Sequence, residues 1–460
     1  MPYTPHTPQD REEMLKAIGL EKMEDLFRGV PKAIRLDRPL NIPSRKSEAE
    51  ILGEFERMAS KNLRLDSRPS FLGAGSYNRF VPAAIDYLAS RGEFNTAYTP
   101  YQPEVSQGTL QAIFEYQTLI CRLTGMEISN ASMYEAGTAV AESVLMAHAI
   151  RDSSKKVLVS EGVHPEYRRV LETYLRNHPL ELVTIPISEG VTQLNAIEGQ
   201  IGLDTAAVVI QSPNFFGSIE DGPAIGKLLQ SKPEEARPFF VVVADPVSLA
   251  LLEPPGAYGA NIALGDGQPL GNYPAYGGPT FGYFTTRMTH VRKVPGRIVG
   301  ETKDRDGNRG YVLTFQTREQ HIRRERATSN ICTNQGLLSL RGAMYLSLLG
   351  EAGLREVAEA SVRMAHHAHA RLTQIPGVKA VFQAPFFFEF ALRLPVDAEH
   401  AYDHLALHGI TGGLPLGRYF PERRHEMLFA CTELTRLEHL EHLTIALKEI
   451  CQRAPALASH

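Results

Sequence analysis

The sequence lacks a hydrophobic run long enough to cross a membrane, since no stretch approaches the roughly 18 apolar residues that a spanning helix needs. Its first thirty residues are charged and interrupted by proline, and they contain no apolar core of a secretory signal. We therefore expect a cytoplasmic protein without membrane contact.

The sequence is also poor in cysteine. Four are present, far apart along the chain: Cys121, Cys332, Cys431 and Cys451. Their spacing fits no zinc motif, and their number is too small for a disulfide framework. The close histidines His366, His367 and His369 lie in an alanine-rich helical run and are expected at its surface. We therefore expect no metal site.

No excess of positive charge is present either, because the net charge is −4. A chain without a basic field is not expected to bind nucleic acid or an anionic membrane. What is present is typical of a globular protein, with 43% apolar and 22% charged residues. A length of 460 residues predicts two or three domains.

The N-terminal residues contain sequence motifs that are typical of helix starts. Thr7-Pro8 has the form of a helix start and Gly19 that of a stop, and residues 47–50 form a capping box before a second helix that runs to about Lys61. We expect residues 1–69 to form a helical arm that packs on a partner or on the main body.

Short β-branched runs then alternate with helical segments. Strands are expected at 156–160, 182–186, 206–211 and 239–245, with helices near 166–177 and 223–230. This alternation predicts a mostly parallel sheet covered by helices on both faces, within a large α/β domain over residues 70–330.

The residues that follow the expected parallel sheet show a different pattern of helices and strands. A helical segment near 319–325 precedes a long helix from about 334 to 374, strands at 380–382, 386–394 and 427–431, and a helix at 437–451. Residues 331–460 are therefore expected to form a long connecting helix and a small C-terminal α+β domain.

Asp245 ends a fully apolar strand, so its carboxylate is expected at the carboxyl edge of the sheet. In fold type I enzymes that use pyridoxal phosphate (PLP), an aspartate at such a strand end pairs with the pyridine nitrogen. Those enzymes also need a lysine further along the chain as the Schiff-base nucleophile. The stretch 261–279 contains no lysine, and Gln268 cannot form an imine. The nearest downstream lysine, Lys293, lies in a sequence typical of a solvated turn.

Six strings resemble the P-protein of the glycine cleavage system, at residues 71–77, 97–111, 130–134, 244–246, 265–271 and 327–334. The resemblance runs over essentially the whole chain and implies the PLP-dependent transferase fold type I, which is aminotransferase-like. P-proteins occur as one chain with two homologous halves or as two subunits, and 460 residues hold one half. The PLP-binding half carries a His-Lys pair before a Gly-Gly-Pro loop, and Gln268 stands close to that lysine position.

The resemblance therefore implies the lysine-less, N-terminal-type subunit of a glycine decarboxylase, glycine dehydrogenase (decarboxylating). Its partner would be the PLP-bearing second subunit, in a heterotetramer with two copies of each. The complex would decarboxylate glycine, release CO₂ and pass the aminomethyl group to the lipoyl arm of H-protein. No cofactor is expected in this chain itself, where Asp245 and Gln268 would be vestigial.

A loop rich in phenol, amide and hydroxyl groups is the best candidate for this subunit's contribution to an interface active site. Its polar members are Tyr98, Thr99, Tyr101, Gln102, Glu104, Ser106 and Gln107. They provide donors and acceptors that suit a small zwitterion. The alternative is that Tyr98 and Tyr101 pack the loop, which Pro100 and Pro103 hold open.

A second polar segment precedes the long helix: Ser329, Asn330, Cys332, Thr333 and Asn334. These residues are expected to cap the helix, and Asn334 to contribute to the site as well. Cys332 is either a thiol near a lipoyl path or a buried inert cysteine. The arginines around Glu319, with an expected Glu319–Arg323 pair, form a solvated helix face or a docking face for an acidic carrier.

Other readings remain open. Gly73 and Gly75 do not complete a dinucleotide fingerprint, because position 78 is asparagine, so nicotinamide binding is rejected. A self-sufficient PLP lyase or transferase using Lys293 is one alternative, and a catalytically silent scaffold or regulatory subunit is another.

Overall fold

The computed structural model describes residues 5–65 and 67–457. The chain divides into two compact units between Leu63 and Arg64. The domain boundaries expected at 69/70 and 330/331 stay predictions.

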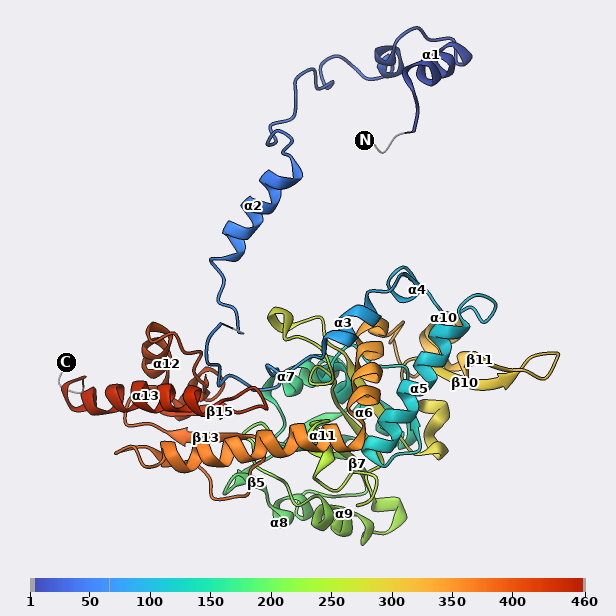
Figure 1. Ribbon diagram of the computed structural model, residues 1–460. Helices are drawn as coiled ribbons and strands as arrows, with labels where there is room; N and C mark the ends of the chain where they lie inside the picture. The colour runs from blue at the N-terminus through green and yellow to red at the C-terminus, as the bar shows by residue number, and fades with distance from the viewer. Residues whose placement is uncertain (1–4, 66, 458–460) are drawn as a thin grey trace. The chain divides into compact units, whose positions relative to one another are not determined.

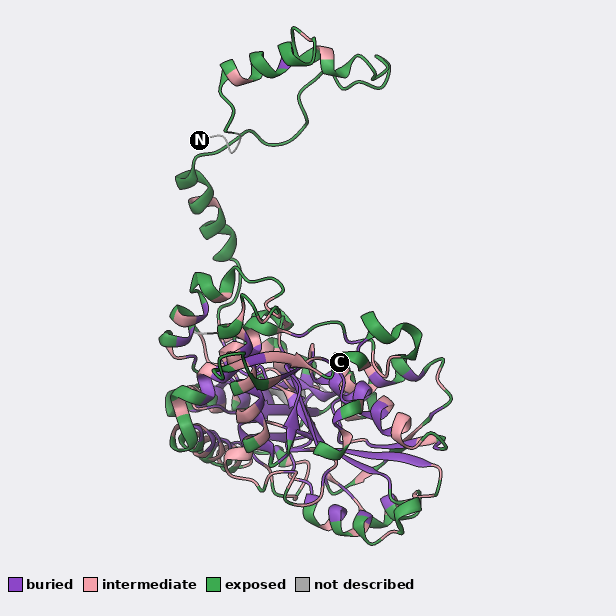
Figure 2. Cartoon of the chain, turned by 90° about the vertical axis from the view of Figure 1, so that its right-hand side faces the viewer, coloured by how far each residue is buried: buried purple, intermediate pink, exposed green. Residues whose placement is uncertain are grey.

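The first unit consists of short helices, namely α1 (Pro8–Ala17), η1 (Met23–Phe27) and α2 (Glu48–Ala59). The two expected helix starts are confirmed, because Thr7 and Ser47 each form a capping box with the residue three positions on. In Figure 2 almost all of this unit is coloured as exposed. One face of α2 carries four exposed apolar side chains: Ile51, Leu52, Phe55 and Met58.

The second unit is built on a seven-stranded sheet of order β1-β9-β8-β7-β6-β2-β3. Figure 1 labels its central strand, β7, among the helices of this unit. Its strands are β1 (Ile128–Ser129), β2 (Lys156–Ser160), β3 (Glu181–Ile185), β6 (Thr205–Ser212), β7 (Phe239–Ala244), β8 (Ile262–Asp266) and β9 (Gly282–Thr286). Neighbours from β3 to β8 pair in parallel, while β9 is antiparallel to both β8 and β1. The predicted, mostly parallel sheet is confirmed.

Both faces of this sheet are buried, which explains the unbroken apolar runs. On β7, Val241 and Val243 belong to the core shared with α6 (Ala136–Ile150) and α7 (Pro165–Leu175). Phe240 and Val242 belong to the opposite core, beside α8 (Leu194–Glu198) and α9 (Gly222–Gln230). Successive side chains of a strand point to opposite faces, so a strand covered on both sides must be apolar throughout. Figure 2 shows the sheet as the buried centre of this unit.

The C-terminal part contains a four-stranded antiparallel sheet of order β12-β13-β15-β14. These strands are β12 (Lys379–Ala380), β13 (Glu389–Arg393), β14 (Leu414–Pro415) and β15 (Glu426–Ala430). It packs with α11 (Gly336–Leu372), α12 (Ala398–Leu407) and α13 (Leu437–Leu457). The predicted long helix is α11, and it is interrupted at Gly350, whose φ of 58° is left-handed.

Short elements complete the unit. The helices are α3 (Ala83–Ala89), α4 (Gly92–Asn95), α5 (Gln107–Thr124) and α10 (Gln320–Arg323). Two hairpins pair β4 (Ile187–Ser188) with β5 (Val191–Thr192) and β10 (Ile298–Lys303) with β11 (Arg309–Thr314). The 3-10 turns are η2 (Glu234–Ala236), η3 (Ser248–Ala250), η4 (Ala275–Gly277), η5 (Met288–Lys293), η6 (Gln316–Arg318), η7 (Arg324–Arg326), η8 (Leu416–Arg418) and η9 (Pro421–Arg423). No helix among the described residues is both long and apolar enough to span a bilayer.

The prediction of one continuous helix near 319–325 is wrong. The segment is divided into α10 and η7 because Arg324 adopts a left-handed φ of 53°. The carboxylate of Glu319 is buried and faces Arg297 at 3.8 Å and His321 at 3.6 Å, in place of the expected pair with Arg323. Residues 320–326 are exposed, so the segment is solvated as expected, but it does not form one regular helix face.

Candidate functional site

The carboxyl ends of the parallel strands bring two carboxylates together. Asp245 directly follows β7, and its Oδ1 accepts a hydrogen bond from the backbone N–H of Ser248 at 2.8 Å. Asp266 ends β8 and accepts bonds from the Thr280 hydroxyl at 2.6 Å and the Gln268 N–H at 2.9 Å. This edge is where open α/β sheets bind their ligands.

Gln268 stands close to the position at which the resemblance expects a Schiff-base lysine. Its Oε1 accepts from the backbone N–H of Tyr77 at 2.8 Å. Its Nε2 donates to the carbonyls of Tyr77 at 3.0 Å and Asn272 at 2.7 Å. The side chain is buried and satisfies three backbone groups, so it acts as a clamp between two loops.

Glu389 of β13 enters the same cluster from the small sheet. It accepts from the N–H of Ala74 at 2.7 Å and from the hydroxyl of Tyr77 at 2.8 Å. A Cβ at position 73 would collide with this carboxylate, which explains Gly73 without a phosphate. Burial raises the pKa of Glu389 to about 7 and that of Asp266 to about 6. Burial also raises the pKa of Asp245 and lowers that of His164 to about 4.

The cavity that remains here is small, about 40 Å³, and Asp245, Asp266, Tyr77, Tyr167 and Glu389 help to line it. Such a volume holds a few waters at most, because one water needs roughly 10–15 Å³ by this measure. No described residue lining it is a lysine. The residues present therefore do not fit PLP, because the cavity is too small for the cofactor and its described lining offers no lysine for an imine.

The buried Glu389 predicts a pH effect. Between pH 4.5, the ordinary pKa of a glutamate, and about pH 7, Glu389 of the folded chain keeps a proton that the unfolded chain has released. The free energy of unfolding should therefore fall as pH rises through this window, by up to about 3 kcal/mol. Glu389→Gln should remove this pH dependence. The free energy of unfolding of the variant, minus that of the wild type, should therefore increase from pH 4.5 to 7.5.

Urea unfolding at several pH values measures this difference. The opposite effect of His164, which favours the folded state as pH rises from 4 toward 6.5, is common to both proteins and cancels. Exposed Glu422 gives the matched control, and Glu422→Gln should run parallel to the wild type. Parallel curves for Glu389→Gln as well would contradict the buried neutral carboxyl.

A second, larger cavity of about 400 Å³ lies beside the 97–101 loop. It is bounded by the start of α11, the first part of α5 and the segment around Cys332. Four of the predicted site residues line it: Tyr98, Thr99, Tyr101 and Asn334. A volume of this size lies in the range typical of small-molecule pockets.

Tyr101 is the centre of the cavity's polar contacts. Its hydroxyl donates to Oδ1 of Asn334 at 2.5 Å and lies 3.1 Å from the hydroxyl of Thr333. The guanidinium of Arg297 stacks on its ring, with Cζ 3.9 Å from the ring centroid. Asn334 is buried and donates to the carbonyl of Ala131 at 3.2 Å. The described lining of the cavity therefore includes a fixed phenol, a fixed amide and the guanidinium of Arg297.

The other members of the predicted loop are not brought to this cavity. Gln102 and Glu104 are exposed, and Ser106 begins α5 without a side-chain capping bond. Gln107 binds the backbone of Tyr311 through both its amide atoms, at 2.9 and 2.8 Å, and so fastens α5 to β11. Tyr98 is 95% exposed, so packing within the chain does not account for it.

The expected capping of α11 by residues 329–334 is wrong. The cap position is Gln335, whose side chain makes no capping bond; its N–H donates to the hydroxyl of Ser132 at 3.0 Å. Asn334 is instead committed to Tyr101, and Cys332 is exposed and lines the cavity. Cys332 is therefore not a buried cysteine.

Arg297 is the functional candidate that the sequence did not reveal. In the sequence it stands in a basic stretch that reads as a solvated turn. Its side chain is only 17% exposed because it lies between the Tyr101 ring and the buried carboxylate of Glu319. Partners so far apart along the chain leave no local signal.

Known proteins resemble this chain in both sequence and structure. A family model described as "Glycine cleavage system P-protein" matches residues 1–447. The probable glycine dehydrogenase (decarboxylating) subunit 1 of Moorella thermoacetica is 47% identical over 451 residues, which cover 98% of this chain and 100% of the relative. A crystal structure of glycine decarboxylase (P-protein) of the glycine cleavage system, in inhibitor-bound form, is 49% identical with a TM-score of 0.88, covering 98% of this chain and 100% of that one.

A more distant structure shares the fold alone. A C-DES mutant with glycine covalently linked to its PLP cofactor is 13% identical with a TM-score of 0.61, covering 84% of this chain and 97% of that chain. The predicted fold type I architecture is confirmed. With a family match over nearly its whole length and a relative of similar length at 47% identity, the chain belongs to the P-protein family of the glycine cleavage system.

Proposed function

We propose that this chain is the lysine-less subunit of a two-subunit glycine decarboxylase and that it is active only in complex with a PLP-bearing partner subunit. The observation that carries the proposal is the clamp made by Gln268, together with the small cavity at Asp245. A fold built for PLP that has no room and no lysine for it must obtain the cofactor's chemistry from a second chain.

Within this proposal, the complex decarboxylates glycine, releases CO₂ and transfers the aminomethyl group to the lipoyl arm of H-protein. PLP bound by the partner supplies an electron sink for the carbon that loses CO₂. The assembly is a heterotetramer with two copies of each subunit, and it works in the cytoplasm.

The cavity beside the 97–101 loop is this chain's proposed share of the active site. Arg297 supplies positive charge that suits a carboxylate or the polar end of the carrier arm, and Tyr101, whose proton is donated to Asn334, supplies a phenol oxygen of fixed position that can accept a hydrogen bond. Preorganised polar groups of this kind orient a small substrate with little loss of entropy.

Exposed aromatic side chains on the 97–101 loop, on α3 and on the loop after β8 support a protein partner. Tyr98 is 95% exposed and Tyr276 93% exposed. Tyr87 on α3 is also exposed, and the hydroxyl of Tyr273 donates to Asp86 of the same helix at 2.7 Å, which ties the loop of Tyr276 to α3. Aromatic residues are enriched at protein interfaces, so their exposure here suits a partner surface.

Reduction with borohydride tests the proposal. The isolated chain, incubated with PLP and reduced, should carry no pyridoxyl-lysine and show no visible cofactor band, and activity should appear only when the partner subunit is added. Peptide mapping that finds the pyridoxyl group on Lys293 would support the self-sufficient enzyme instead, and Lys293→Ala would then remove the band. The geometry gives Lys293 no such role, since it ends η5 and does not line the Asp245 cavity.

A further inference from the structure

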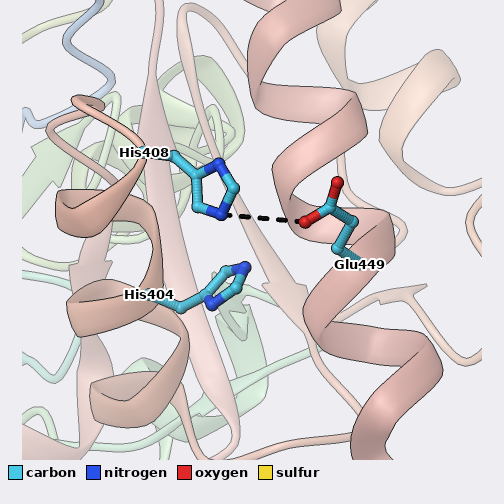
Figure 3. A group of neighbouring side chains, drawn as sticks. All are labelled: His404, His408 and Glu449. Atoms are coloured by element: carbon cyan, nitrogen blue, oxygen red, sulfur yellow. Dashed lines mark ion pairs between the residues drawn. The ribbon is translucent and has the colours of Figure 1, made fainter.

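Three side chains with metal-binding atoms gather where α12 meets α13, apart from both cavities described above (Figure 3). His404 lies in the last turn of α12, His408 follows at the C-terminal end of that helix, and Glu449 projects from α13. One ligand atom from each lies within 4.8 Å of the other two. The proposed decarboxylase function uses none of them.

The spacing of these side-chain atoms is close to that of ligand atoms around a bound metal ion. Nε2 of His408 lies 3.7 Å from a carboxylate oxygen of Glu449, and the two imidazole rings lie 4.6 Å apart between centroids. In a tetrahedral zinc site, bond lengths of about 2.0–2.2 Å place neighbouring ligand atoms about 3.4 Å apart. Small side-chain rotations would bring the three atoms to that spacing.

The backbone fixes the histidine pair. The N–H of His408 donates to the carbonyl of His404 at 3.3 Å, so the helical register holds and places both rings on one face of α12. Glu449 comes from the neighbouring helix, and all three side chains are partly buried. One ligand pair on one helix and a third ligand on another is an arrangement that an ion would bridge.

We propose that His404, His408 and Glu449 bind a divalent transition-metal ion of the zinc class. Two imidazole nitrogens and one carboxylate oxygen suit Zn²⁺, Ni²⁺ or Cu²⁺, whereas Mg²⁺ and Ca²⁺ prefer sites made of oxygen alone. Water completes the coordination. The bound ion links α12 to α13 and stabilises the C-terminal part of the chain, because it binds the folded state only.

Zinc titration of the full-length subunit, free of any histidine tag, tests this site. Competition against a chromophoric chelator should give one Zn²⁺ per chain, and Zn²⁺ should raise the melting temperature while Mg²⁺ leaves it unchanged. Co²⁺ in place of Zn²⁺ should give a visible spectrum of low-symmetry coordination. His404→Ala and His408→Ala should each weaken Zn²⁺ binding by at least about tenfold, and Glu449→Gln should also weaken it.

His400 provides the matched control, because it is exposed on the same helix one turn before His404 and is not part of the group. His400→Ala should bind Zn²⁺ as the wild type does. Melting curves in chelator show whether each variant folds, so a lost site is distinguished from a lost fold. Zinc retained by the His404→Ala/His408→Ala double variant would assign the metal elsewhere, for example to exposed Cys332, and would overturn the proposal. So would a wild-type chain that binds no Zn²⁺, where the His408–Glu449 pair is an ion pair only.

Discussion

Arg297→Ala is expected to lower kcat/KM of the assembled decarboxylase for glycine by about 100-fold. A loss of this size is typical when the substrate or a catalytic group is displaced by about 1 Å. Arg297 is the cation that lines the larger cavity, and its guanidinium holds the ring of Tyr101 from one side. Removing it takes away both the charge and the support of the phenol. The measurement is steady-state kinetics of the reconstituted complex with saturating H-protein.

Two variants and one control show what Arg297 does. Arg297→Lys keeps the charge without the planar stack, so a carboxylate-binding role predicts partial recovery in KM. Tyr101→Phe removes the hydrogen bond to Asn334 and should lower kcat while assembly is retained. Arg292 is exposed and outside the cavity, so Arg292→Ala should behave as the wild type does. If Arg297→Ala and Tyr101→Phe both assemble with the partner and keep full kcat/KM, the cavity takes no part in catalysis and the silent-scaffold alternative is favoured.

Gln268→Leu is expected to reduce the free energy of unfolding by about 3 kcal/mol or more. The substitution leaves the N–H and C=O of Tyr77 and the C=O of Asn272 without their partner in a buried place, and each such loss costs about 1–3 kcal/mol. Urea unfolding measures the change. Gln200 is exposed, so Gln200→Leu should change stability by less than about 0.5 kcal/mol. Equal stabilities for the two variants would show that the clamp carries little energy.

Gln268→Lys asks whether the missing amine is the only difference from a PLP enzyme. A lysine there should not create a cofactor band, because the cavity of about 40 Å³ has no space for the pyridoxal ring. It should also destabilise the chain, since an ammonium group cannot accept the hydrogen bond of the Tyr77 N–H. A pyridoxyl group trapped on the introduced lysine would show that the pocket opens.

The sequence predicted the sheet well because its signals there are local and repeated. A strand buried on both faces must be apolar at every position, as β7 is, and helix starts such as Ser47 carry their own capping chemistry. The same reasoning failed near residue 324, where a left-handed residue divides the helix, because an arginine gives no warning of a positive φ.

The candidate site was predicted in part. The 97–101 loop stands out for its phenols and hydroxyls, and Tyr98, Thr99, Tyr101 and Asn334 share one cavity in the structure. Gln107 shows the limit of such reasoning, since an amide that looks suited to a ligand fastens a helix to a strand. Arg297 shows the opposite limit, because its contact is with Tyr101, far away along the chain.

The clamp at Gln268 also bears on how cells make the two subunits. Since its own side chains close the cavity beside Asp245, a surplus of this chain would not sequester PLP from other enzymes. Unequal translation of this chain and a second subunit would thus leave the free vitamin B6 supply undisturbed, and, with the cofactor carried by the second subunit as proposed, cofactor loading would depend on the abundance of that subunit.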